Sequence, residues 1–318
     1  MNGIFNILKP SGMTSHDVVA FVRKKMPSGV KVGHTGTLDP AASGVLPICT
    51  GKATRIASFF LEGDKGYRAV VKFGITTDTL DGEGKVIHRE VVSDIKISVI
   101  EDALNKIRGE IEQTPPAFSA VRHKGKHLYE LARKGESVAV PPRKVTVYEI
   151  NIADYFPSEF PELIIDIRCS HGTYIRSIAS NLGEAMNCGA HLSFLVRTFS
   201  GPFEIKDAVT INEFEERAKE GDLKSILFPM DTVLNKFHKI TVKESALKYL
   251  INGNMLYPDQ VAGQSINRGA EEKNELLRIY DEEGNFWGLG RWHRTSESLM
   301  FKTEKLLRSQ KEKLEEWK

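Results

Sequence analysis

The chain has 318 residues, of which 41% are hydrophobic and 27% charged, enough for one buried core and, we expect, a second. No apolar run of about 20 residues occurs, and no short apolar run follows a basic start, so neither membrane spanning nor secretion is indicated. The cytoplasm is the expected location. The net charge of +2 is too small to indicate a partner by itself.

The first predicted elements are a short helix, a shaped loop and two strands. Ser15 stands before a run of apolar residues at helical spacing that Pro27 stops: Val18, Val19, Val22 and Met26. Residues 33–47, GHTGTLDPAASGVLP, are too rich in glycine and proline for a helix or strand and predict a loop. Residues 67–74 and 85–91 predict strands on either side of the turn-forming stretch TLDGEG.

The middle of the chain continues with helices between strands. Ser98 and Glu101 suggest a capping box that opens a helix over 98–112. Two strands are predicted at 145–152 and 162–169, and a helix at 172–187. Because there is no regular alternation of strand and helix, the pattern favours an α+β fold over a doubly wound sheet.

The character of the sequence changes near residue 236, where we expect a domain boundary. A hairpin is predicted within 276–292, with its turn at 283–285. Residues 301–318 alternate in charge and predict a solvated helix or a frayed tail.

Positive charge is concentrated in residues 122–144, which hold seven Lys and Arg against two Glu. This local charge of +5 includes Arg122, Lys124 and Lys126, and Tyr129 and two histidines lie among the cations. Such a segment suits contact with a phosphate backbone, because each cation near a phosphate releases counterions. A solvated surface arm explains the same composition equally well.

Sites for metals and nucleotide cofactors are not indicated. Three widely spaced cysteines, Cys49, Cys169 and Cys188, fit neither a disulfide framework nor a zinc knuckle, and we expect buried thiols. Cys188 and His191 lack a second pair of ligands at metal-binding spacing. The phosphate-loop and dinucleotide-binding fingerprints are missing, so no metal and no cofactor are expected.

Asp39 is the single carboxylate in the loop 33–47. Small neighbours let a substrate approach closely, which makes this carboxylate a candidate nucleophile or general base. An aspartate before a proline is also a common turn initiator, and by itself the loop favours that simpler explanation.

Arg176 is a candidate partner for Asp39. It lies near the start of a mostly apolar predicted helix, where a buried guanidinium needs a carboxylate. A two-pronged pair would keep Asp39 ionised and oriented, although Arg176 could instead point to solvent. Tyr67 and Tyr174 could stack on a nucleobase or serve as ordinary half-buried tyrosines.

Several blocks, in order, closely resemble the bacterial tRNA pseudouridine synthase B family. They span most of residues 3–309: ILKPSGMTSHD (7–17), GHTGTLDPAASGVLP, the YR pair at 67–68, DTLDGEG (78–84), GEIEQTPPAFSAVRHKGKHLYELAR (109–133), CSHGTYIRSIASNLGE (169–184) and CGAHLSFLVRT (188–198). The resemblance implies isomerisation of uridine 55 in the tRNA T-loop, without a cofactor.

The resemblance also assigns roles to individual residues. Asp39 matches the catalytic aspartate, Arg176 the arginine paired with it, and Tyr67 the tyrosine that stacks on the target base. His34 matches the histidine that occupies the space left by the flipped nucleotides. Tyr174 and Leu195 match the uracil pocket, and Lys9 with Pro10 matches a motif near the site, so we expect Lys9 to contact the substrate.

The family pattern further implies a domain organisation. Residues 1–236 would form the catalytic domain, a mixed, largely antiparallel sheet with flanking helices. Its basic segment 122–144 would be a mobile thumb that closes over the T-loop. Residues 237–309 would form a small β-rich RNA-binding domain of the PUA kind, followed by a charged tail at 310–318.

Three chemical paths are compatible with the resemblance. Asp39 could add to C1′ of the ribose, remove a proton at C2′, or add to C6 of the base, and Tyr67 is our hypothesis for the acceptor of the C5 proton. We expect a monomer that binds the tRNA T-arm without a protein partner. The alternatives are a non-catalytic RNA-binding protein, a nucleoside glycosylase and a guide-RNA-dependent relative.

Overall fold

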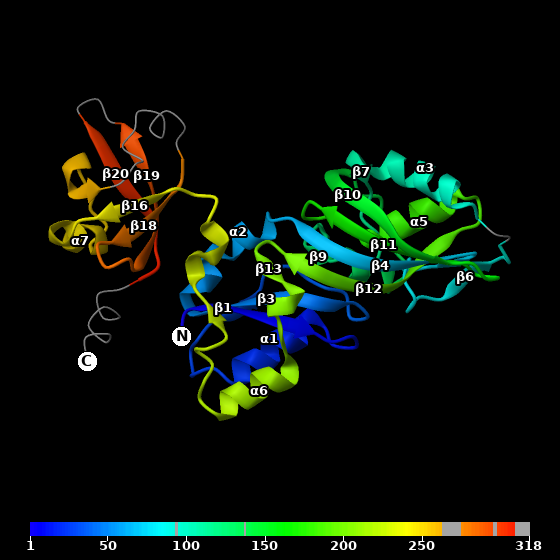
Figure 1. The fold of residues 1–318 in the computed structure, drawn as a ribbon, viewed down its shortest axis with the longest axis horizontal. Coiled ribbons are helices and arrows are strands. Elements are labelled where there is room, and N and C mark those ends of the chain that lie inside the picture. Colours follow the sequence, from blue (N-terminus) through cyan, green and yellow to red (C-terminus); the bar gives the residue numbers. More distant parts are fainter. Residues whose placement is uncertain (93–94, 137, 263–274, 295–297, 309–318) are drawn as a thin grey trace. The chain divides into compact units, whose positions relative to one another are not determined.

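The computed structural model describes residues 1–92, 95–136, 138–262, 275–294 and 298–308. The chain divides into two compact units, one running from Gly3 to Leu227 and the other beginning at Phe228. Figure 1 draws the elements of both units. The division lies ahead of residue 236, where the change in sequence character suggested a boundary.

The first unit is built on one mixed sheet of eleven strands that is largely antiparallel, as predicted. Its continuous order is β14 (Val209–Thr210), β1 (Gly3–Lys9), β3 (Ser43–Thr50), β12 (Ala190–Ser200), β4 (Lys65–Phe73), β11 (Glu162–Cys169), β10 (Arg143–Phe156) and β7 (Gly109–Gln113). Three short strands pair beside this path: β2 (Val32–His34), β13 (Phe203–Glu204) and β15 (Leu227–Phe228). Along this path, the pairs β1–β14 and β3–β12 are parallel and the other pairs are antiparallel.

Helices and two small hairpins complete the first unit. The helices are α1 (Ser15–Lys24), α2 (Ala57–Leu61), α3 (Ile97–Ile107), α4 (Leu128–Ala132), α5 (Ile175–Ala185) and α6 (Ile211–Lys219), with 3-10 turns η1 (Gly51–Ile56) and η2 (Ile205–Asp207). The hairpins are β5 (Ile75–Thr77) with β6 (Val86–Arg89), and β8 (Arg122–His123) with β9 (Lys126–His127).

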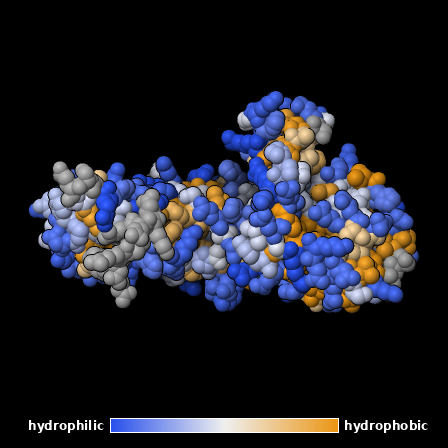
Figure 2. Space-filling view, turned by 90° about the horizontal axis from the view of Figure 1, so that it is seen from above, coloured by the Kyte–Doolittle hydropathy of each residue, from blue (hydrophilic) through white to orange (hydrophobic). Residues whose placement is uncertain are grey.

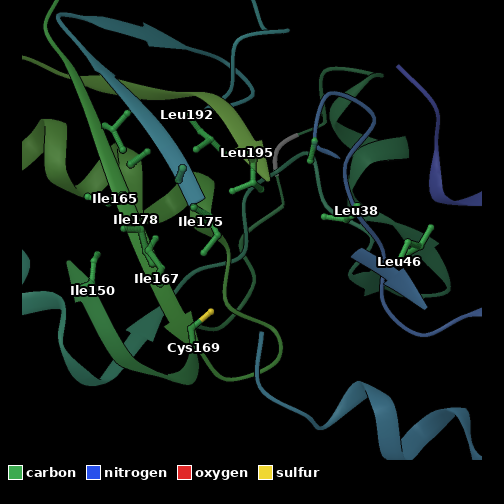
Figure 3. Close-up of a cluster of buried hydrophobic side chains, with 14 of the residues drawn as sticks. Leu38, Leu46, Ile150, Ile165, Ile167, Cys169, Ile175, Ile178, Leu192 and Leu195 are labelled. Carbon is green, nitrogen blue, oxygen red and sulfur yellow. The ribbon is translucent and has the colours of Figure 1, made fainter. Parts of the chain in front are cut away.

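Alternating side chains in β11 place one face of the sheet against α5 (Figure 3). In β11 the residues Leu163, Ile165 and Ile167 are buried while their neighbours are not, which is the period of a strand with one face against a core. Figure 3 shows β11 isoleucines facing Ile175 and Ile178 of α5. Each buried aliphatic side chain of this kind contributes about 2 kcal/mol, so the start of α5 is held firmly.

Two predicted caps are wrong in detail. Thr14, not Ser15, caps α1, and its hydroxyl pairs reciprocally with Asp17. The proposed Ser98–Glu101 box does not form: Lys96 caps α3 without a side-chain hydrogen bond. The helix also ends at Ile107, because Gly109 adopts a positive φ of 90° and starts the strand β7.

The second unit is a five-stranded sheet in the order β17 (Val261–Ala262), β16 (Lys239–Val242), β18 (Leu277–Asp281), β19 (Phe286–Arg294) and β20 (Leu299–Leu306). It also contains η3 (Met230–Leu234), α7 (Glu244–Ile251) and η4 (Pro258–Gln260). The predicted hairpin is confirmed, with Gly284 in its turn. Residues 301–306 are strand rather than helix, and the tail 310–318 lies outside the described residues.

The surface seen in Figure 2 is mostly hydrophilic with scattered hydrophobic patches. Within the described ranges, no helix is both long and apolar enough to cross a membrane. The three cysteines are free and buried, as predicted. Burial raises the pKa of Cys49 and Cys169 to about 12, so neither is a thiolate at neutral pH.

Candidate active site

The loop that carries Asp39 joins β2 to β3, and side chains from distant segments hold its backbone. Ser15, at the start of α1, both accepts from the Leu38 N–H at 2.8 Å and donates to the Leu38 carbonyl at 2.9 Å. Ser11 donates to the carbonyl of Ala41 at 2.8 Å. The backbone on both sides of Asp39 is therefore fixed, while its carboxylate stays available.

Lys9 fixes the same loop from the end of β1. Its side chain is fully buried, and its ammonium donates to the carbonyls of Pro10, Met13 and Pro40 at 2.9, 2.6 and 3.1 Å. Burial lowers the pKa of Lys9 to about 8. All three donors of the ammonium are used in these bonds, so Lys9 supports the backbone of the loop beside Asp39.

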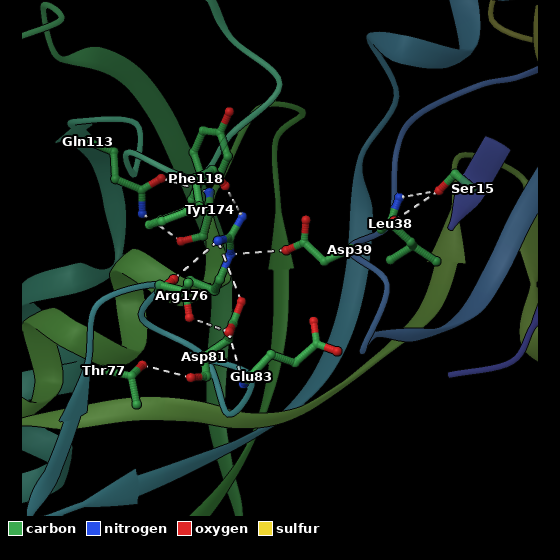
Figure 4. A network of polar contacts seen from close by, with 11 residues as sticks. Ser15, Leu38, Asp39, Thr77, Asp81, Glu83, Gln113, Phe118, Tyr174 and Arg176 are labelled. Carbon is green, nitrogen blue, oxygen red and sulfur yellow. Dashed lines mark hydrogen bonds and ion pairs between the residues drawn. The ribbon is translucent and has the colours of Figure 1, made fainter. Parts of the chain in front are cut away.

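Arg176 meets Asp39 from the second residue of α5, as Figure 4 shows. Its Nε lies 3.0 Å from Oδ2 of Asp39, and the guanidinium side chain is only 6% exposed. The pair is not the two-pronged one we expected. The other nitrogens donate to the carbonyls of Thr79 at 3.2 Å and Phe118 at 2.9 Å.

A second carboxylate, Asp81, shares this guanidinium. Its Oδ2 lies 3.6 Å from Nη1 of Arg176, and its side chain is 14% exposed. The Thr79 hydroxyl and the Glu83 N–H donate to the other oxygen of Asp81. In the sequence, TLDGEG predicted a turn and DTLDGEG was one of the blocks shared with the family, but neither pattern indicated the contact between Asp81 and Arg176.

Asp39 is the acid that remains open to a ligand, since its side chain is 41% exposed. Partial burial raises the pKa of Asp39, the charge on Arg176 lowers it, and the charge on Asp81 raises it again. The net direction is upward. A raised pKa makes the ionised carboxylate a stronger base, and its contacts fix its orientation. Such a group is suited to nucleophilic or general-base chemistry.

The pH dependence of catalysis should report this arrangement. Arg176→Gln removes the charge that keeps the Asp39 pKa down, so the acid limb of the rate profile should move to higher pH. Turnover near pH 7 should fall about 10²-fold, the scale seen when one electrostatic contact is removed. The measurement is single-turnover product formation against pH. Arg68→Gln, which breaks an exposed pair with Asp166, should leave the limb in place; an unmoved limb in Arg176→Gln would contradict the assignment.

Tyr174 and Gln113 form a further contact that sequence reasoning missed. Tyr174 caps α5, and its backbone N–H and C=O both bond to the side-chain amide of Gln113, at 2.8 and 3.0 Å. The buried Gln113 ends β7, just before the stretch that leads to the basic segment. This clamp positions the start of α5 and therefore Arg176.

Tyr67 and Leu195 lie on the neighbouring strands β4 and β12. Tyr67 is half-buried against the core, and Leu195 is buried within it. Burial raises the pKa of Tyr67, and the charge on Asp39 contributes in the same direction. The structure thus brings Tyr67 into the electrostatic range of Asp39.

His34 lies at the end of β2, where its surroundings favour the neutral form of the imidazole. Burial lowers its pKa, and the Gly36 N–H approaches Nδ1 at 3.3 Å, which favours the tautomer with the proton on Nε2. His34 lines a cavity of about 600 Å³ together with Arg23 and Lys31, and Asp39 is not among the lining residues.

The basic residues Arg122, Lys124 and Lys126 lie on the hairpin β8–β9 with their side chains exposed. Lys124 and Gly125 form its turn with φ of 48° and 87°. Among the described residues, these three cations make no salt bridge. Next to them, His127 and Tyr129 stack with ring centroids 5.2 Å apart.

Comparison with known proteins bears on this site. The profile of the TruB family pseudouridylate synthase N-terminal domain matches residues 23–175, and that of the tRNA pseudouridylate synthase B C-terminal domain matches residues 176–235. The tRNA pseudouridine synthase B of Caldanaerobacter subterraneus is 42% identical over 91% of this chain and 95% of its own. The chain belongs to the TruB family of pseudouridylate synthases.

Other relatives extend this result. The tRNA pseudouridine synthase B of Alkaliphilus oremlandii is 48% identical over 81% of this chain and 83% of its own. That of Clostridium perfringens is 42% identical over 96% of this chain and 99% of its own. A solved H/ACA RNP bound to a substrate RNA containing 2′-deoxyuridine matches with a TM-score of 0.68 and 26% identity, over 96% of this TruB-family chain and 85% of that one.

Proposed function

We propose that this TruB-family enzyme isomerises uridine 55 in the T-loop of tRNA to pseudouridine. The observation that carries the proposal is the Asp39 carboxylate, held by Arg176 at 3.0 Å on a loop whose backbone is fixed from both sides. Relatives at 42–48% identity that bear the name tRNA pseudouridine synthase B support tRNA as the substrate.

The reaction breaks the bond from C1′ to N1, rotates the uracil and joins C1′ to C5. The target base must first leave the RNA stack, which costs a few kcal/mol. Stacking on Tyr67 and occupation of the gap by the neutral His34 offset part of that cost. Tyr174 and Leu195 enclose the detached uracil, so that it rejoins the ribose instead of escaping.

Asp39 acts on the ribose by adding to C1′ or by removing a proton at C2′, or it adds to C6 of the base. Each path uses an ionised carboxylate oriented by Arg176. Tyr67 accepts the C5 proton as a phenolate, and N1 of the rotated uracil takes up a proton in return, so that no net proton is gained or lost. The reaction is an isomerisation without oxidation or net hydrolysis, so these side chains suffice for it.

The rest of the chain supports RNA binding in this proposal. The hairpin with Arg122, Lys124 and Lys126 is a thumb over the T-loop, and the unit from about residue 237 is a PUA-like domain. The enzyme works in the cytoplasm as a monomer, without a protein partner. A guide-RNA-dependent mode is less well supported, since the H/ACA neighbours are 25–27% identical to this chain.

The test is a T-arm stem-loop incubated with the protein and scored for pseudouridine at each uridine by carbodiimide modification and primer extension. Conversion at position 55 alone supports the proposal. A stem-loop with cytidine at position 55 is the matched control and should remain unmodified. Binding of the stem-loop without any conversion would instead indicate a non-catalytic RNA-binding protein.

The double substitution Lys124→Ala with Lys126→Ala tests the thumb. Affinity for the T-arm should fall at low salt. The magnitude of the slope of log K against log[salt] should decrease by about 1 to 2, because each lost phosphate contact contributes about 0.7 to 0.9 to it. The rate for bound RNA should change little, since among the described residues neither lysine contacts Asp39 or Arg176. Lys72→Ala, on β4, is the control for loss of charge. An unchanged salt slope would contradict a role in phosphate contact.

A further inference from the structure

Arg197 is a buried arginine next to the site that the proposed chemistry leaves without a role. It lies on β12 with 1% of its surface exposed. Its Nε donates to the carbonyl of Val45 at 2.7 Å, and its terminal nitrogens donate to the carbonyls of Gly36 at 3.2 Å and Thr37 at 3.4 Å. One guanidinium therefore binds the Asp39 loop before and after the aspartate.

The same side chain also reaches Tyr67. Strand β12 lies between β3 and β4, and Arg197 is directly opposite Tyr67 in the antiparallel pair with β4. Residues opposite each other in such a pair project from the same face of the sheet. The charge of the guanidinium lowers the pKa of the Tyr67 phenol, so the two side chains lie within electrostatic range of each other.

The charge of Arg197 is costly where it lies. Among the described residues, no carboxylate forms a salt bridge with it. Its charge also contributes to lowering the pKa of Lys9 and of Lys65, so it opposes neighbouring cations. A buried guanidinium without an acid costs more than an apolar side chain of similar volume, so packing alone does not account for it.

We propose that Arg197 is a positioning residue for the isomerisation: it joins the Asp39 loop to the Tyr67 phenol and thereby sets the distance between the carboxylate and the ring on which the target base stacks. This inference rests on the proposed function, because it concerns the geometry of that reaction. A displacement of about 1 Å at a reacting centre can cost 10²-fold in rate, so one shared anchor is sufficient to matter.

The experiment compares Arg197→Met and Arg197→Lys with the full-length wild-type enzyme. The single-turnover rate on a bound T-arm stem-loop should fall about 10²-fold in Arg197→Met, while the Kd for the stem-loop stays within about threefold. Arg197→Lys should recover only part of the rate, because an ammonium cannot span three carbonyls and a phenol. The matched control is Arg68→Met. Arg68 follows Tyr67 on β4, but its side chain is exposed.

Chemical rescue separates positioning from folding. In Arg197→Ala, methylguanidinium at tens of millimolar should raise the single-turnover rate at least tenfold, whereas methylammonium at the same concentration should not. Circular dichroism confirms that each variant is folded under assay conditions. A folded Arg197→Met with a wild-type rate, a loss confined to Kd, or a folded Arg197→Ala that methylguanidinium does not rescue would overturn the inference. If the wild type itself makes no pseudouridine, the proposed function fails instead.

Discussion

Asp39→Asn should abolish pseudouridine formation while leaving the protein folded and able to bind the T-arm. The amide retains the shape of the carboxylate, and its oxygen can still accept from Nε of Arg176, which contacts Asp39 at 3.0 Å. It cannot act as a nucleophile or base, so the single-turnover rate should fall about 10⁴-fold or more, as when a catalytic nucleophile is removed. Gel-shift binding and carbodiimide mapping on the same samples measure both quantities.

The control for this variant is Asp166→Asn, which removes an exposed carboxylate paired with Arg68 on the same sheet. It should retain the full rate. Turnover in Asp39→Asn clearly above the level without enzyme would show that another group performs the chemistry, and the central assignment would be wrong. A loss of binding in parallel with activity would point to a role in RNA contact instead.

Tyr67→Phe should keep the stacking ring and T-arm affinity but lose nearly all product formation, by about 10³-fold or more. Removal of the phenol oxygen takes away the proposed proton acceptor, at a typical cost of 10² to 10⁴ for general acid–base catalysis. The measurement is release of tritium from stem-loops labelled at C5 of uridine 55. It follows the C5 proton directly.

Loss of the phenol also removes a partner from the buried Arg197, which should reduce stability by about 1 to 3 kcal/mol. Thermal unfolding of Tyr67→Phe therefore accompanies the rate measurement. Tyr148→Phe, with its side chain largely exposed on β10, is the control. Near-normal tritium release by a folded Tyr67→Phe would remove Tyr67 from proton transfer.

The fold and the core of the site could be predicted where short-range patterns carry the information. Alternating burial in strands such as β11 follows from period-two hydrophobicity, which is visible in the letters. Arg176 could be matched to Asp39 because a guanidinium among apolar helix residues needs an acid, and the structure shows their contact at 3.0 Å.

The parts of the site that the sequence did not indicate depend on contacts between residues that are distant in sequence. Asp81 and Gln113 act through Arg176 and through the backbone of Tyr174, and no local pattern indicates either contact. Lys9 was expected at the substrate, but the three carbonyls around its ammonium come together only in the folded chain. The motif of Lys9 and Pro10 indicated a place near the site, but it did not indicate that the ammonium binds backbone carbonyls.

The error in residues 301–306 has a similar cause. The alternation of charge around Lys302 and Glu304 suggested a solvated helix, yet the same spacing suits a strand with one polar face. Phe301 is fully buried in the core of the second unit, where it packs against Trp292 of β19 with ring centroids 5.2 Å apart. Tertiary packing therefore outweighed the local helical tendency.

The role of Asp39 in an isomerisation is tested most directly with a doubly labelled T-arm stem-loop, which carries tritium at C5 and carbon-14 in the uracil ring of uridine 55. We expect the wild-type enzyme to release tritium to water while all carbon-14 stays in the RNA as pseudouridine, and Asp39→Asn to release neither label. Release of carbon-14 as free uracil would show a glycosylase and rule out the isomerisation.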